Sequence, residues 1–499
     1  MKVDIGRNYS WLIIFLLGLF YLIFLSRYPS SDAYANAFLS ITGKDLFKPH
    51  HLLYSGFGYI ILKIFNNTSF EPIRILQVVN VLFAILSLIV TRQILKRANQ
   101  KEGLIASALI FLGSCFGFLR FAVDNECYII PLFFSIVSIN FIQSLSIQTK
   151  TYKVVLCGLS TAIGCLFHQI VVFVLICSFF FILFREKFKN VVIFVLISLI
   201  IPLVYFLVIY FNFGEINIKT ITNFVLHDYV NDTAQMPILK NIFPLFFLSF
   251  IRTFIQVHGY IHTIIIDSPI FSYLTIAFSF IFFVLGIVKL FKIKRCSINL
   301  FSQKWMVLFL WSLLIFYLAF AIFSNSNAEF MVIVPFLIVF LLVYYLKNIR
   351  KSLLYFAIML LIWNFFFFLI PFSTMKMNNN YDIAKKIHQK EDAIFLLDSK
   401  VEVDNIYAYK YRKEPVNTFK PSKITSEEFN NWIKDKKEIY TDVFGSSFAI
   451  SRKTIVEENT NRKKENVVFS NKNLFKKESE FYSLTSKTEI WSFISKFAN

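Results

Sequence analysis

The feature that most constrains this chain is a series of apolar runs, each close to the length of a bilayer crossing, that recur from residue 11 to residue 370. The chain is 57% hydrophobic and 18% aromatic, with a mean hydropathy of +0.61. A soluble domain does not tolerate so much apolar surface in water. The sequence therefore predicts a polytopic α-helical membrane protein. Its first run lacks a small-residue cleavage site, so we expect an uncleaved first helix.

We expect about eleven transmembrane helices. The long apolar run after residue 153 is split near His168, because one helix of that length would be too long for the hydrocarbon layer. The predicted spans are 11–26, 75–91, 103–119, 127–147, 154–168, 169–184, 190–211, 270–288, 305–323, 329–346 and 353–370.

The distribution of basic residues sets the expected orientation. With the split, most Lys and Arg of the connecting segments fall on one side, which the positive-inside rule places in the cytoplasm together with the N-terminus. The external loops are then 27–74 and 212–269, and the chain after residue 370 is extracytoplasmic. We expect a multi-pass protein of the plasma or inner membrane, in contact with membrane lipids. The net charge of +20 follows this topology, so nucleic-acid binding has no support.

Two domains are predicted, a transmembrane domain over residues 1–370 and a small soluble α/β domain over residues 371–499. In the soluble domain, "AIFLLDS" and "NIYAYKY" resemble short strands and "SEEFNNWIKDKK" resembles a helix. In the membrane domain, the partly apolar stretches 51–65 and 242–266 are expected to lie on, or re-enter, the outer leaflet. Six cysteines lie in or beside apolar runs without metal-ligand spacing, and we expect no disulfide: Cys115, Cys127, Cys157, Cys165, Cys177 and Cys296.

Charged side chains of the membrane domain gather at its outer end. Asp32 follows the first span directly, and the turn between the third and fourth spans holds Arg120, Asp124 and Glu126. A carboxylate at this depth is costly unless it is solvated or paired. Each one alone is compatible with an ordinary interfacial loop residue, but together they predict a polar cavity. Three histidines are expected at the same height: His50, His51 and His168.

Several of these segments resemble the GT-C glycosyltransferases. "SSDAYANAFLSITGKDLFKPHHLLYSGFGYIILKIF" is similar to their first external loop, "FLRFAVDNECYIIPLFF" to their second acidic turn, and "GLSTAIGCLFHQIVV" to their fifth span. "NAEFMVIVPFLIVF" and "IWNFFFFLIP" extend the likeness to the protein O-mannosyltransferase and aminoarabinose transferase branches. The resemblance covers roughly residues 11–372.

The resemblance implies a GT-C type bundle and a hexosyl- or pentosyltransferase that uses a polyprenyl-phosphate sugar. The sugar would pass, with inversion, to a hydroxyl of a lipid, glycan or protein acceptor at the outer membrane face. Asp32 would be the catalytic base, while Asp124 and Glu126 would hold the acceptor or orient a basic residue. We expect no cofactor, and a divalent metal at the Asp124–Glu126 turn is the less favoured alternative.

One motif departs from the family. Many relatives carry an Arg-Tyr pair at the outer start of the span where this chain has Glu329 and Phe330, so the partner of the donor phosphate must differ. The substitutes are Arg120 together with three residues of the second long loop, which are equally compatible with snorkelling on an amphipathic helix: Arg252, His258 and His262.

Two other classes of function remain open on sequence alone. A transporter or flippase of lipid-linked glycans or small molecules would also place charges in an outward cavity. It should, however, carry polar residues along the middle of its helices, whereas "VVIFVLISLIIPLVYFLVIYF" is almost entirely apolar. A non-catalytic assembly or sensor protein would need no clustered carboxylates. The sequence therefore favours the transferase.

Overall fold

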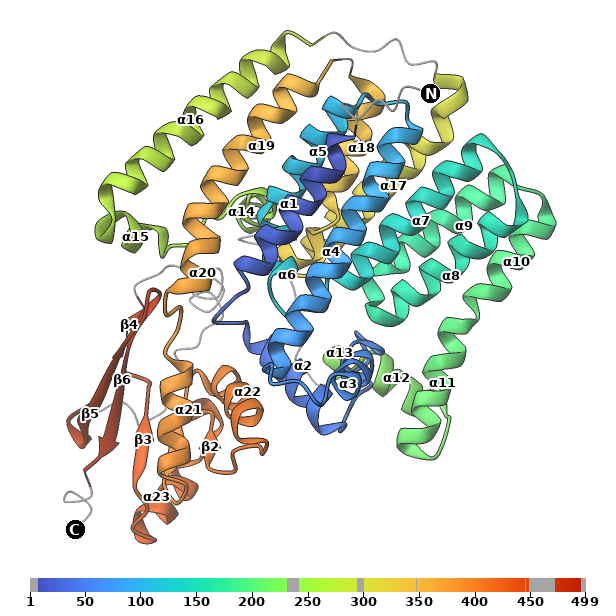
Figure 1. The fold of residues 1–499 in the computed structure, drawn as a ribbon. Coiled ribbons are helices and arrows are strands. Elements are labelled where there is room, and N and C mark those ends of the chain that lie inside the picture. The colour runs from blue at the N-terminus through green and yellow to red at the C-terminus, as the bar shows by residue number, and fades with distance from the viewer. Residues whose placement is uncertain are drawn as a thin grey trace.

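The structure, a computed structural model, describes residues 8–230, 242–293, 300–346, 348–444, 446–447 and 472–494. A large helical bundle forms most of the molecule, and a small α/β domain lies at one end of it (Figure 1). The first and last described residues lie at opposite ends of the molecule. The predicted fold class, a polytopic helical bundle with a small C-terminal sheet, is confirmed.

Each of the eleven predicted spans coincides with helical structure. Among the described residues, seven helical segments are long and apolar enough to cross a membrane, or eight if the bent pair α5–α6 is one span. The helices at the other three predicted spans are apolar but shorter, so the count of eleven crossings stays a prediction. The bundle helices are α1 (Tyr9–Ile23), α4 (Pro72–Arg97), α5 (Glu102–Ser114), α6 (Phe116–Ala122), α7 (Ile129–Ile147), α8 (Thr151–Phe167), α9 (Val172–Arg185), α10 (Phe188–Ser198), α11 (Ile200–Phe213), α16 (Pro269–Phe291), α17 (Leu300–Phe323), α18 (Val334–Tyr345), α19 (Arg350–Asn364) and α20 (Ile370–Thr374).

The predicted break at His168 is present. Helix α8 ends at Phe167, and His168 has an extended backbone with φ −160° and ψ 128°. Its Nδ1 accepts a hydrogen bond of 3.1 Å from the backbone N–H of Ile170, which opens a 3₁₀ turn that leads into α9. The side chain thus caps the second helix, and the long apolar run becomes two antiparallel helices.

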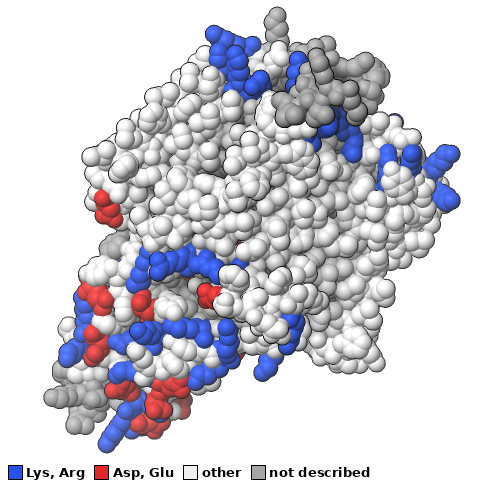
Figure 2. Space-filling model, in the orientation of Figure 1, with Lys and Arg blue, Asp and Glu red and all other residues white. Residues whose placement is uncertain are grey.

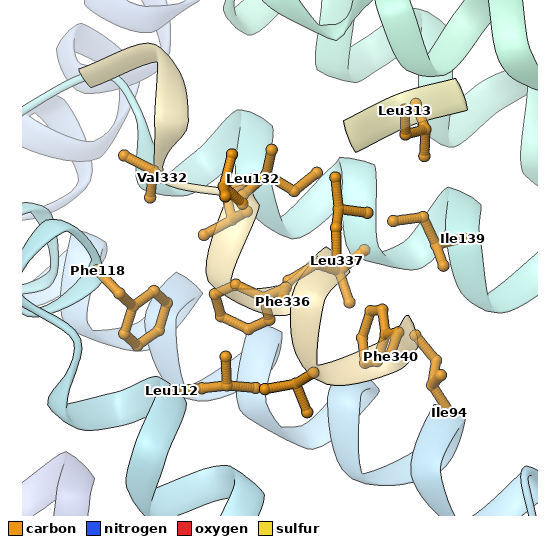
Figure 3. Close-up of a cluster of buried hydrophobic side chains, with 14 of the residues drawn as sticks. Ile94, Leu112, Phe118, Leu132, Ile139, Leu313, Val332, Phe336, Leu337 and Phe340 are labelled. Atoms are coloured by element: carbon orange, nitrogen blue, oxygen red, sulfur yellow. The ribbon is translucent and has the colours of Figure 1, made fainter. Parts of the chain in front are cut away.

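The centre of the bundle is α18, whose side chains are buried nearly all round. Phe336, Leu337 and Phe340 interdigitate with side chains of α5, α6, α7 and α17 (Figure 3). The rings of Phe118 and Phe336 meet nearly edge-on with centroids 5.3 Å apart. A helix that is apolar on every face is stable only when other helices surround it, which explains the central position of this segment.

The outside of the bundle is apolar over a broad belt. Lys and Arg gather at one end of this belt and over the C-terminal domain at the other, with few charges between them (Figure 2). On α16, Phe280 is 65% exposed and Phe291 is 86% exposed, which is typical of side chains that face lipid. The surface therefore agrees with a membrane-spanning bundle.

Shorter helices cover the end of the bundle that faces the α/β domain. Helix α2 begins where Ser30 Oγ accepts a hydrogen bond from Ala33 N, and it ends at Gly43, whose φ of 72° favours glycine. The predicted helices at 51–65 and 242–266 are present as α3 and as α14 with α15. Helix α14 packs against α6, α17 and α18 with one face, while Phe243 and Phe247 on another face are exposed. These helices are α2 (Ser31–Thr42), α3 (Tyr54–Ile64), α12 (Ile218–Val225), α13 (His227–Val230), α14 (Ile242–Phe254) and α15 (Ile261–Asp267).

The C-terminal domain contains a mixed sheet in the order β2-β1-β3-β6-β4, with β5 paired to β6. Strand β1 is parallel to β2 and β3, and β6 is antiparallel to β3, β4 and β5. The elements are α21 (Asn380–Gln389), β1 (Ile394–Leu396), α22 (Lys400–Tyr411), β2 (Thr418–Phe419), α23 (Ser426–Lys434), β3 (Ile439–Thr441), β4 (Ser446–Ser447), β5 (Phe475–Tyr482) and β6 (Ser486–Phe493).

One predicted strand of this domain is wrong. "NIYAYKY" lies within α22, whereas the strand at "AIFLLDS" and the helix at "SEEFNNWIKDKK" are present as β1 and α23. Val403, Ile406 and Tyr407 lie three and four residues apart and pack into the core of the domain. Tyr409 points the other way, toward α2. Because α22 is buried on two sides, the segment has the apolar composition of a strand, although its buried residues recur with the period of a helix.

Candidate active site

Asp32 lies in the first turn of α2, at the end of the bundle that faces the C-terminal domain. The residue before the helix, Ser30, is held by Asp124: the backbone N–H of Ser30 donates to Asp124 Oδ2 at 3.0 Å. The Asp32 side chain is solvent-exposed, and its carboxylate forms no hydrogen bond or ion pair with another described residue. An accessible carboxylate on a fixed helix start is suited to accept a proton.

Helix α4 holds the turn that carries the other predicted carboxylates. Asn80 Nδ2 donates to the carbonyl oxygens of Asp124 and Glu126 at 2.7 and 2.8 Å. Asp124 is buried and its second oxygen accepts from the backbone N–H of Asn125 at 2.8 Å. Both oxygens of Asp124 therefore serve the backbone, so that this residue positions the start of α2. Tyr54 joins the turn by donating to Asn125 Oδ1 at 2.8 Å.

Arg120, at the end of α6, stands between two glutamates. Its Nη2 lies 3.6 Å from Glu126 Oε1 and 3.9 Å from Glu329 Oε1. Glu329 Oε2 also accepts hydrogen bonds from Tyr128 Oη at 2.9 Å and Asn327 Nδ2 at 3.0 Å. The sequence marked Glu329 only as a departure from a family motif, whereas the structure places it in the acidic cluster. Its position at the outer start of a predicted span was a local signal in the sequence, but its partners lie about 200 residues away in the chain.

Burial, together with repulsion between neighbouring carboxylates, raises the pKa of the acidic groups. Burial among protein atoms, then the charge of Glu329, raises the pKa of Asp32 above its ordinary value, although its side chain still reaches solvent. Burial, then Glu329, raises the pKa of Glu126 well above the usual range, and burial raises the pKa of Asp124. Arg120 opposes each of these shifts. The four carboxylates therefore act on one another around a single arginine, as expected of a shared site.

The three predicted histidines lie side by side next to this cluster. His50 Nδ1 lies 3.2 Å from Gln169 Oε1. The rings of His51 and His168 have centroids 6.2 Å apart, and His168 lies 5.1 Å from the ring of Tyr128. They therefore form a wall of the site, and the tyrosine links them to Glu329.

One group here has the composition of a metal site. The ligand atoms of His51, Cys127 and His168 lie within 4.8 Å of one another. His168 Nδ1, however, accepts the N–H of Ile170, so the neutral ring carries its proton on Nε2. His168 thus presents a donor instead of a lone pair. We derive no metal-dependent step from these residues, and the expectation of a cofactor-free site stays a prediction.

The basic residues of the second long loop divide into two groups. The guanidinium of Arg252, on α14, lies 5.6 Å from the ring of Phe116, at the start of the helix that carries Arg120. Burial, then Arg252 and Arg120, lowers the pKa of His258 to about 4, so these three groups lie together. His262 is exposed on α15. Within the described part of the chain, no hydrogen bond, ion pair or ring contact joins its side chain to the cluster.

Five described cysteines are free thiols, as expected, and Cys296 lies outside the described residues. The described part of the second long loop comprises residues 212–230 and 242–269. All ten predicted site residues are thus placed. Nine gather at one end of the bundle, and His262 is the one without a described link to them.

No family model matches the sequence, and no curated protein matches it either. Among solved structures, the fold is similar to ArnT from Cupriavidus metallidurans bound to undecaprenyl phosphate. The TM-score is 0.54 at 11% identity, over 98% of this chain and 99% of that one. It is also similar to the apo oligosaccharyltransferase of Archaeoglobus fulgidus, with a TM-score of 0.50 at 12% identity, over 88% of this chain and 70% of that one.

Both structures are GT-C glycosyltransferases, the superfamily that the sequence motifs resemble. The likeness to ArnT runs over nearly the full length of both chains, so it includes the C-terminal domain as well as the bundle. At these identities the likeness concerns the fold. The chain therefore has the fold of the GT-C glycosyltransferase superfamily.

Proposed function

We propose that this protein is an integral-membrane glycosyltransferase that takes a sugar from a polyprenyl-phosphate donor and attaches it to an acceptor hydroxyl at the extracytoplasmic face. The observation that carries the proposal is the cluster of Asp32, Asp124, Glu126 and Glu329 around Arg120 on a GT-C fold. Replacing a buried ionic cluster with apolar side chains of similar volume is often neutral or stabilising, so fold stability alone does not account for this one.

In the proposed reaction, Asp32 removes the proton of the acceptor hydroxyl as its oxygen attacks the anomeric carbon of the sugar. The bond between that carbon and the phosphate oxygen breaks, and its electron pair leaves with the polyprenyl phosphate. One displacement inverts the configuration at carbon. The raised pKa of Asp32 makes it a stronger base than an ordinary aspartate once it is ionised.

The phosphate requires a cation, and Glu329 cannot supply one. Arg120 and Arg252 are the candidates, since both contribute to the low pKa of His258. We assign the stabilisation of the leaving phosphate to this pair, with His258 as a neutral hydrogen-bonding group. Arg120 then has two roles, because it also holds Glu126 and Glu329 in place.

An apolar cavity of about 300 Å³ supports a lipid-linked donor. It is lined by side chains of α5, α14, α16, α18 and α19, and includes Phe254 at the end of the helix that carries Arg252. ArnT was solved bound to undecaprenyl phosphate, and an archaeal oligosaccharyltransferase of Archaeoglobus fulgidus in complex with a dolichol phosphate. We propose a donor of the same chemical class here, with sugar and acceptor as the unknowns.

The test uses the purified full chain in lipid nanodiscs with a panel of radiolabelled polyprenyl-phosphate sugars. We expect release of the sugar to water, or its transfer to added membrane lipids, above the level seen without protein. Movement of an intact labelled lipid across a liposome bilayer, without cleavage of the sugar, would contradict the proposal and favour a flippase. A reporter fused after the last residue gives the orientation: an enzyme active only in the cytoplasm should be silent there.

A further inference from the structure

The C-terminal domain meets the start of α2 through helix α22. Helix α22 packs along α2, and Figure 1 shows it as the part of the domain beside that helix. Asn405 Nδ2 donates to Ser31 Oγ at 2.9 Å, and the rings of Tyr409 and Tyr34 have centroids 5.3 Å apart. Tyr409 Oη also donates to Glu71 Oε1 at 3.0 Å. The contact is thus built from specific polar and aromatic pairs.

These contacts fall on the residues next to the proposed base. The backbone N–H of Ser30 is held by Asp124 of the bundle, and the side chain of Ser31 is held by Asn405 of the C-terminal domain. Asp32 follows directly in the chain. The start of α2 is therefore fixed from two sides, and neither domain alone supplies both hydrogen bonds.

The same helix also brings a charge to the site. Glu402 lies three residues before Asn405, and residues three apart share one face of a helix. Its carboxylate is close enough to Asp32 to contribute to the raised pKa of that residue, after burial and Glu329. Helix α22 thus acts on both the position of Asp32 and the electrostatic potential around it.

We infer that α22 is a wall of the catalytic site and that Asn405 is a positioning residue, which sets the carboxylate of Asp32 through its hydrogen bond to Ser31. The inference rests on the proposed function, since it assigns a task to the domain for the same base. Asn405 itself does not contact the reacting atoms. Its effect passes through the first turn of α2, so its loss should change turnover and not donor binding.

The decisive variant is Asn405→Ala, compared with Asn431→Ala, which makes the same change on an exposed position of α23 in the same domain. We expect kcat to fall by about 10- to 100-fold in the first variant, because small displacements of a reacting group cost rates of this order. KM for the polyprenyl-phosphate sugar should stay within about twofold in both, since the donor groups belong to the bundle. Asn431→Ala should keep the wild-type kcat.

A double-mutant cycle separates positioning from general loss of structure. Ser31→Ala removes the other half of the hydrogen bond, so we expect a similar loss of kcat, and little further loss in the double variant. Asn405→Gln keeps the amide donor and should recover part of the rate. Fully additive losses, or no recovery with glutamine, would overturn the role of the hydrogen bond.

Hydrogen exchange provides a readout that needs no activity. Backbone amides of residues 31–42 should exchange faster in Asn405→Ala, and at the wild-type rate in Asn431→Ala. Unchanged exchange in α2, or an unchanged kcat in Asn405→Ala when the wild type is active, overturns the inference and leaves the proposed function intact. A wild-type protein that turns over no donor in the panel overturns both.

Discussion

The two ends of the bundle hold their buried charges in different ways. At the end away from the C-terminal domain, Arg92 is matched with Glu102 at 2.9 Å, and its Nε donates to Ser10 Oγ. At the other end, one arginine faces two glutamates at 3.6 and 3.9 Å, with Asp32 and Asp124 nearby. The first site pairs one arginine with one glutamate at a short distance, whereas the second has excess negative charge and longer contacts.

This contrast separates the charges that stabilise the fold from those that are kept for another reason. A one-to-one pair with its remaining donors satisfied loses stability when either partner is removed. A cluster with excess carboxylates raises its own pKa values and is a cost to the folded state unless a ligand uses it. The excess carboxylates at this end are therefore kept for a purpose other than stability, such as accepting a proton.

The largest expected effect is the loss of activity in Asp32→Asn. The amide keeps the size of the side chain but cannot take a proton, so transfer should fall by on the order of 10² to 10⁴ while the melting temperature stays unchanged. The measurement is turnover of the labelled donor in nanodiscs, with thermal unfolding of the same samples.

Asp45→Asn is the matched control for that substitution. Asp45 is exposed in the same external loop and has a φ of 47°, a conformation that asparagine adopts readily. Its change should leave turnover within about twofold. If Asp32→Asn kept near-wild-type transfer, Glu126 would become the candidate base, because both oxygens of Asp124 are already committed to backbone groups.

Substitution of Arg92 should mainly lower stability, whereas substitution of Arg120 should mainly lower turnover. Arg92→Met leaves Glu102 without its cation and should lower the free energy of unfolding by about 3 kcal/mol, with normal turnover per folded molecule. Arg120→Met should destabilise less than half as much, because the carboxylates around it can take up a proton. It should nevertheless reduce turnover by about 10²-fold or more, since a cation that faces the leaving phosphate is lost.

Chemical denaturation and donor turnover of both variants measure this pair. The contrast between the two ends fails if Arg92→Met mainly lowers turnover, or if Arg120→Met mainly lowers stability. Arg97→Met is a third substitution for this comparison. Arg97 Nη1 donates to the side chain of Asn140 at 2.7 Å, so we expect the variant to lose stability and to keep normal turnover, as Arg92→Met does.

Much of the fold follows from sequence because its determinants are local. Apolar runs and flanking charges mark the helices, and His168 marks a break since its side chain caps the next helix within two residues. The strand predicted at "NIYAYKY" failed for the opposite reason. Tyr409 is buried by α2, a helix more than 360 residues earlier in the chain, and no local pattern contains that contact.

The sequence predicts which residues of the candidate site lie together, but not which contacts each of them makes. Asp32, Arg120 and Glu126 stand out as charges at the outer ends of spans, and the structure brings them together. Which carboxylate is free depends on backbone amides: Asp124 accepts two, and Asp32 none that is described. The sequence could not supply the contribution of Glu329, because its partner Tyr128 lies 201 residues away.

The smallest expected effect is a shift in the pH dependence of turnover, and it tests the sign of the electrostatics directly. Asp32 must be ionised to accept a proton, so kcat should rise with pH through the pKa of that carboxyl. Burial and Glu329 raise this pKa, and Arg120 lowers it.

Glu329→Gln removes a negative neighbour, which makes ionisation of Asp32 easier and moves the acid limb to lower pH, by about half a unit to one unit. Arg120→Met removes a positive neighbour and should move the limb of its residual activity to higher pH. Glu391→Gln, an exposed position of the C-terminal domain, should leave the limb in place. Shifts of the two site variants in the same direction would show that the limb reports a group other than Asp32.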